Sequence, residues 1–365
     1  MNSLDYLIGN STIIKACSWM LALFLLLNIR GAFRRDSKNG TGYFLLFIVM
    51  VVYCVFYSPT TGDNYTSMES YYAYRAGIGY EQLHFERVYF YIMDIVPYGY
   101  VYYRLVLWGS ACLLCVWLMK KMEISGQVAT LSVLTFALPI LLYYQRAAFA
   151  YVLLYFALYC FVTKGGGFEA VPFLKRHYIF VSAGILLCTI PFHTTMPVYV
   201  LFLLIALFVP KSETGLLFLI LGLMVFSTSL ISNSISMLKF FQEDTIETGL
   251  RSLENDTGIV GQNFNGALAY FLHWLPLYCM LLYGLFFMVK SPCHHTYFEK
   301  VCLVNTFILI VLSIMFMPYS YIIQIKFRNA AMMPWTLYLA SYYTRNSGTR
   351  ACSLYALATI PTFFI

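Results

Sequence analysis

The sequence predicts an all-α membrane protein, a polytopic bundle of about 12 transmembrane helices with two larger external loops. Of the 365 residues, 61% are hydrophobic and 11% are charged, whereas soluble domains carry about 25% charged residues. A soluble fold of this length has too little interior for so much apolar surface, but lipid can cover it. The apolar runs are continuous, which excludes a barrel of short alternating strands. We expect residues 1–365 to form a single integral membrane domain.

The first apolar run is expected to stay in the protein as a helix. Residues 1–10 contain Asp5 and no basic residue, and no small-residue cleavage site follows the run. The later runs are each long enough to cross a bilayer, some only with interfacial anchoring. The expected spans lie near 11–29, 42–58, 100–119, 127–144, 147–163, 178–192, 195–210, 214–232, 267–289, 301–318, 329–343 and 351–365.

The distribution of charge predicts the orientation. One set of loops (30–41, 120–126, 164–177, 211–213, 290–300 and 344–350) holds 14 of the 23 Lys and Arg residues and 5 of the 16 Asp and Glu residues. The opposite side keeps the remaining 9 basic and 11 acidic residues. Basic residues concentrate on the cytoplasmic side. We therefore expect these loops in the cytoplasm and both termini outside.

Two external loops stand out by their length, at 59–99 and 233–266. Long loops in compact proteins often carry function. The first contains an apolar stretch, 88–97, which is too short to span and is expected to form a re-entrant or interfacial helix. The second is polar and charged, as expected for a lid or an amphipathic segment.

Cations at the outer ends of spans are candidates for binding an anion. Arg146 follows one span and opens the next, where its guanidinium could bind a diphosphate through two hydrogen bonds. The alternative is an interfacial Arg that only extends toward water. Arg328, with Lys326 beside it, is expected just outside span 329–343. Two cations on the outer side oppose the positive-inside bias, which favours a role in binding.

Three residues are candidates for acid–base chemistry. His193 lies at the tip of a tight hairpin, 178–210, whose turn also contains Pro191 and Pro197. It could act as a general base or bind a phosphate, or it could simply cap a helix end. Asp63 and Glu86 are the acidic candidates of the first loop.

The first loop is also rich in tyrosine. Residues 59–104 contain 11 Tyr, including Tyr65, Tyr71 and Tyr72. Tyrosine is common at membrane interfaces. The same density suits sugar binding, because an aromatic ring can pack on a pyranose while its hydroxyl bonds to the sugar edge. Composition does not separate these two interpretations.

Several other classes are excluded or disfavoured. The net charge of +7 does not indicate nucleic-acid binding, because the basic residues are scattered over helix ends. Nearly all of the 10 Cys lie inside apolar segments, so no disulfide framework is expected.

Five short motifs in this order resemble the EpsG family of exopolysaccharide polymerases, which is related to Wzy-type repeat-unit polymerases. The family's Gly-x-Asp-type start of the first external loop is similar to 61–65, and its Glu-led apolar segment to 86–91. Its Arg-Gln-x-x-Ala helix start is similar to 146–150, where Ala147 replaces Gln. Its Phe-His hairpin is similar to 192–194, and its late Tyr…Arg segment to 321–328.

The resemblance implies a membrane-embedded glycosyltransferase of the bacterial inner membrane. Such an enzyme joins polyprenyl-diphosphate-linked oligosaccharide repeat units at the outer face, in capsule, exopolysaccharide or O-antigen synthesis. Membrane lipid and other polysaccharide assembly proteins are the implied partners; no cofactor, metal or nucleotide sugar is implied. Arg146, Arg328 and Lys326 would bind the diphosphate. His193, Asp63 or Glu86 would serve as the base, and Tyr65, Tyr71 and Tyr72 would contact sugar.

Two rival classes stay open. A lipid-linked oligosaccharide flippase or other polysaccharide transporter would act on the same lipid, but repeated halves with broken helices at mid-membrane are not evident. A membrane acyltransferase would need a His buried in a span. Only His273 lies in one, and its neighbour Trp274 favours an interfacial position.

Overall fold

The structure is a computed structural model of the whole chain. It describes residues 4–8, 10–34, 40–56, 63–80, 83, 86–137, 145–210, 212, 214–215, 218–219, 222, 295–316 and 321–346. The expected loop 233–266 and the expected spans 267–289 and 351–365 lie outside these residues. In the described part every regular element is a helix, which confirms the all-α prediction.

The chain divides into two compact units, Met1–Val200 and Leu201–Ile365, and each is described by itself. The first unit begins with a helical turn, η1 (Asp5–Leu7). Its longer helices follow the apolar runs closely. They are α1 (Ser11–Arg34), α2 (Gly40–Phe56), α5 (Tyr100–Lys121), α6 (Gly126–Ser132) with the π-helical turn η3 (Val133–Ala137), α8 (Gln145–Val162) and α10 (Tyr178–Thr189).

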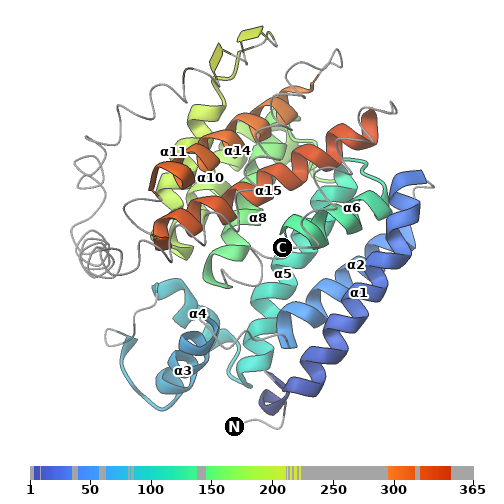
Figure 1. Cartoon of the computed structure of the whole chain (residues 1–365). Coiled ribbons are helices and arrows are strands. Elements are labelled where there is room, and N and C mark those ends of the chain that lie inside the picture. Colours follow the sequence, from blue (N-terminus) through green and yellow to red (C-terminus); the bar gives the residue numbers. More distant parts are fainter. Residues whose placement is uncertain are drawn as a thin grey trace. The chain divides into compact units, whose positions relative to one another are not determined.

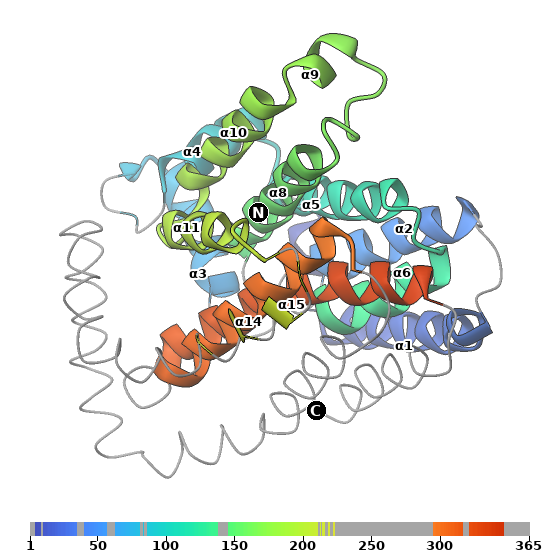
Figure 2. The same cartoon turned by 90° about the horizontal axis from the view of Figure 1, so that it is seen from above.

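These helices pack against one another in a bundle. In both views α1 lies beside α2 and α6, and α2 lies beside α5 (Figures 1 and 2). Helix α8 packs between α5 and α10. Of the described helices, Ser11–Ile29 and Tyr100–Lys121 are long and apolar enough to cross a membrane. The first leaves large apolar side chains such as Trp19 and Leu27 exposed.

Local sequence fixes where several helices begin and end. Asn10 caps α1, because its Oδ1 accepts hydrogen bonds from the amides of Thr12 and Ile13 at 3.0 and 3.4 Å. Helix α8 ends at a left-handed turn, with positive φ at Lys164 and Gly165. A Cβ at Gly165 would lie 3.0 Å from Cα of Lys175, so the turn and the short helix α9 (Pro172–Arg176) approach closely.

The predicted loop 59–99 contains two helices. The short apolar stretch forms α4 (Arg87–Ile95), which confirms a helix there. A second helix, α3 (Asp63–Arg75), occupies a segment that was expected to be a loop. Polar residues dominate α3. This helix therefore has to be stabilised by the packing of its few apolar side chains against neighbouring helices.

The second unit contains α14 (Tyr297–Phe316) and α15 (Tyr321–Arg345), which pack along each other. Helix α15 starts eight residues before the expected span 329–343. Lys326 and Arg328, which were expected just outside that span, therefore lie within helix α15. Helix propensity at 321–328 is adequate, and nothing in that stretch breaks the helical hydrogen bonds.

Candidate functional site

The site is centred on the turn between α10 and α11 (Met196–Ala206), which includes η4 (Ile190–Phe192). Pro191 lies in η4, and Pro197 is the second residue of α11. Both positions tolerate proline because the first turn of a helix has no acceptor for those amides. The chain turns at His193 as expected, but α10 and α11 do not pack along each other as the two arms of a tight hairpin would.

Helix α4 holds this turn from the side. The Tyr89 hydroxyl donates a hydrogen bond to the carbonyl of Phe192 at 2.6 Å. The Thr194 amide donates to Oε1 of Glu86 at 3.4 Å. These two bonds reach the peptide groups on either side of His193. The structure thus brings together two of the predicted acid–base residues, Glu86 and His193, from segments more than 100 residues apart.

His193 itself is buried and makes local contacts. Its backbone is extended, with φ −163° and ψ 140°, and its side chain is 5% exposed. Nδ1 accepts a hydrogen bond from the Thr195 amide at 3.1 Å and lies 2.8 Å from the Thr195 hydroxyl. The imidazole therefore caps the chain just before α11, as one of the two interpretations of this residue expected.

Helix α8 reaches the same turn. The ring of Phe149 lies 5.2 Å from that of Phe192, and Tyr89 contacts Phe192 edge to face at 6.1 Å. Arg146 is the second residue of α8, three positions before Phe149. The side chain of Arg146 lies outside the described part of the structure.

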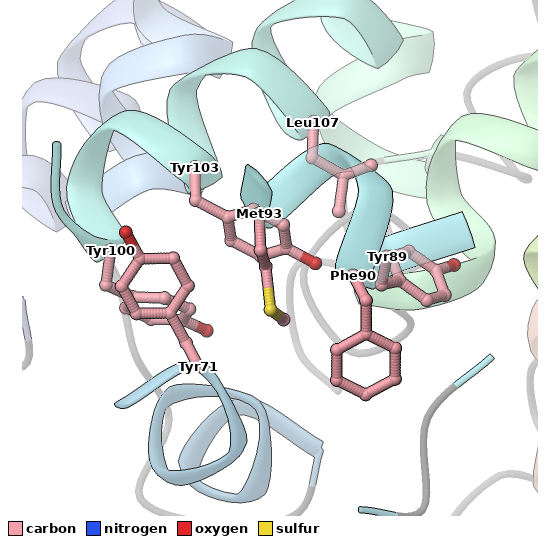
Figure 3. Packing of buried hydrophobic residues seen from close by; sticks show 7 residues of the cluster. All are labelled: Tyr71, Tyr89, Phe90, Met93, Tyr100, Tyr103 and Leu107. Carbon is pink, nitrogen blue, oxygen red and sulfur yellow. The ribbon is translucent and has the colours of Figure 1, made fainter. Parts of the chain in front are cut away.

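A cluster of aromatic residues joins α3, α4 and α5 (Figure 3). Tyr71 from α3 lies against Tyr100 and Tyr103 of α5, at ring distances of 5.5 and 5.6 Å. Its hydroxyl donates to the Val96 carbonyl at 3.3 Å. Tyr71 is only 1% exposed, and its burial raises the pKa of its hydroxyl. In this arrangement Tyr71 packs α3 onto α5, and its ring faces are covered by protein.

The other tyrosines expected to contact sugar are placed differently. Tyr72 is half-buried and donates its hydroxyl to the carboxylate of Asp5. Asp63 and Tyr65 are the first and third residues of α3, and their side chains are outside the described part. Among the tyrosines of this region whose side chains the structure describes, Tyr91 at 67% and Tyr98 at 70% are the most exposed.

Asp5 is a residue whose role the sequence did not indicate. Its two carboxylate oxygens accept hydrogen bonds from the amides of Tyr100 at 3.3 Å and Val101 at 2.9 Å. These amides open α5, where a negative charge is favourable. Burial and the adjacent carboxylate raise the pKa of the Tyr72 hydroxyl, since its ionisation would create a second negative charge there.

Arg104 was also missed. It is 1% exposed on α5, donates from Nη2 to the Cys54 carbonyl at 2.8 Å, and lies over the Trp108 ring at 4.3 Å. Its position inside the expected span 100–119 was a usable signal, because a cation within an apolar span is costly and is often functional. Here it links α5 to the end of α2.

The second unit holds the remaining predicted cations. Arg328 is buried and donates from Nε to Oδ1 of Asn329 at 3.1 Å, while Lys326 is half-buried. Their convergence with Arg146 and His193 on one diphosphate stays a prediction, because those residues belong to the first unit.

The geometry therefore joins α4, the His193 turn and the start of α8 in one place, with an acidic residue, an imidazole and a predicted cation position. Comparison of the chain with protein-family models, with curated proteins and with solved structures gives no match.

Proposed function

We propose that this protein is a polymerase that joins polyprenyl-diphosphate-linked oligosaccharide repeat units at the outer face of the bacterial inner membrane. The observation that carries the proposal is the contact of α4 with the His193 turn through Glu86 and Tyr89. Two segments singled out by the resemblance to EpsG-type polymerases are far apart in the sequence and lie together in space. The start of α8, the third such segment, packs on the same turn through Phe149.

The proposal includes a polytopic arrangement of about 12 spans with both termini outside. It is supported by two membrane-length apolar helices, by the exposed apolar surface of α1 and by the uneven distribution of basic residues. In this topology the His193 turn and α4 lie at the outer face, where the lipid-linked substrates are joined. A polyprenyl tail can then stay in the bilayer while its head group reaches the turn.

The proposed reaction is a glycosyl transfer to a hydroxyl group. The acceptor hydroxyl oxygen bonds to the anomeric carbon of the growing chain, and the bond from that carbon to the diphosphate oxygen breaks with its electron pair. The hydroxyl proton passes to a base, and polyprenyl diphosphate leaves. Cations at Arg146, Arg328 and Lys326 would stabilise the negative charge that develops on the leaving group.

The proposal is tested with the full-length protein in proteoliposomes supplied with lipid-linked repeat units extracted from the host cells. Formation of a ladder of polymer lengths supports it. Arg146→Ala is expected to abolish the ladder, whereas Arg176→Ala, a change at an exposed cation of α9, should leave it intact. Transfer of repeat units across the bilayer without any ladder would instead support the flippase alternative.

A further inference from the structure

The two hydrogen bonds from α4 have a shared geometry. Glu86 immediately precedes the first residue of α4, and Tyr89 lies three residues further along, so both side chains leave the same side of the helix start. The Glu86 carboxylate accepts from the Thr194 amide, which follows His193, and the Tyr89 hydroxyl donates to the Phe192 carbonyl, which precedes it. The peptide groups on both sides of His193 are thus fixed by one short helix, which is itself anchored by the buried residues Phe90 and Met93.

The imidazole is fixed independently at Nδ1. A backbone amide can only donate, so the 3.1 Å bond from the Thr195 amide requires Nδ1 to carry a lone pair. In the neutral ring the proton is then on Nε2. A proton taken up at Nδ1 would face the amide hydrogen of Thr195 and would break this bond.

We infer that Glu86 and Tyr89 are positioning residues, which together with Thr195 present His193 as an Nε2–H hydrogen-bond donor and not as a general base. The catalytic role of His193 as this donor rests on the proposed function. An Nε2–H group suits an oxygen of the departing diphosphate, where negative charge grows during the transfer.

The tautomer is tested without any substrate. The full-length protein is labelled with ¹⁵N-histidine in lipid nanodiscs, and the His193 signals are assigned by their loss in His193→Gln. We expect Nδ1 to show the shift of an unprotonated nitrogen and Nε2 that of a protonated one at neutral pH. Thr195→Val should keep this pattern, because the amide remains. Protonation of Nδ1 with a bare Nε2 would overturn the inference.

The positioning role is tested by pairs of matched variants in the polymerisation assay. Glu86→Gln keeps an acceptor for the Thr194 amide but removes basicity, so it should retain activity, whereas Glu86→Ala should lower kcat about tenfold with little change in KM. Tyr89→Phe should behave like Glu86→Ala, and Tyr91→Phe, at an exposed position, should behave like the wild type. A Glu86→Gln variant as inactive as Glu86→Ala would identify Glu86 as the base and overturn the inference.

The two experiments separate the inference from the proposed function. If no ladder forms with the wild-type protein while the ¹⁵N pattern is as expected, the polymerase proposal fails and the assignment of the tautomer stands. If the ladder forms and Glu86→Gln is inactive, the polymerase proposal stands and the positioning role fails.

Discussion

At the scale of single residues, the most informative contact is the one between Asp5 and the start of α5. Its partners are two amides 95 and 96 residues later, and the Tyr72 hydroxyl also donates to it. A carboxylate that accepts several hydrogen bonds at a helix N-terminus stabilises both the helix and the segment that carries the acid. Asp5 therefore fixes the η1 segment to α3 and α5.

This contact predicts a pH dependence of stability. The pKa of Tyr72 is raised in the folded protein, so the stability that its neutral hydroxyl contributes is fully present below its ordinary pKa of about 10. This contribution is lost as the pH rises through the raised value. The temperature of thermal unfolding in detergent should therefore fall more steeply with rising alkaline pH for the wild type than for Tyr72→Phe. Parallel curves for the two proteins would contradict this expectation.

At the scale of elements, α3 shows what the sequence could not reveal. The segment is polar, and its helical state is stabilised by contacts with α5, chiefly through Tyr71. Helix α4 was predictable because it is apolar and bounded by turn residues. The start of α14 also had a local signal: Thr296 and Glu299 bond reciprocally to each other's amides at 3.2 and 2.9 Å, as a capping box does.

The packing of α3 gives a prediction that separates structural from sugar-contacting tyrosines. Tyr71→Ala removes a fully buried ring and should destabilise the protein by about 3 kcal/mol. Tyr91→Ala removes an exposed ring and should leave the melting temperature unchanged. Melting in detergent and protein abundance in membranes measure both effects. If Tyr71→Ala left both unchanged while shortening the polymer, Tyr71 would be a sugar contact, as the sequence suggested.

At the scale of the whole molecule, composition was enough to predict an all-helical chain, because continuous apolar runs leave few other structures. The candidate site was predictable only as separate residues. Glu86 and His193 could be selected by chemistry, but their meeting depends on how α4 packs on the turn between α10 and α11. Arg104 could have been selected because a cation inside an apolar span is energetically costly. No local sequence signal indicated the partners of Asp5.

The proposed topology predicts which positions are reached from outside the cell. In a variant without native cysteines, a membrane-impermeant maleimide should label Ile78→Cys, which replaces an exposed residue between α3 and α4. It should not label Ala170→Cys, an exposed position before α9, until the membrane is opened. The reverse pattern would place the His193 turn on the cytoplasmic side.

The Asp5 contact also sets an order of events during synthesis. Asp5 is translated before α5, because the amides of Tyr100 and Val101, which donate to its carboxylate, are made about 95 residues later. The η1 segment cannot dock before α5 has been translated and its first turn has formed. Docking of η1 is therefore a late step, and a bulky fusion before residue 5 would hinder the docking of η1 on α5, not the formation of α1.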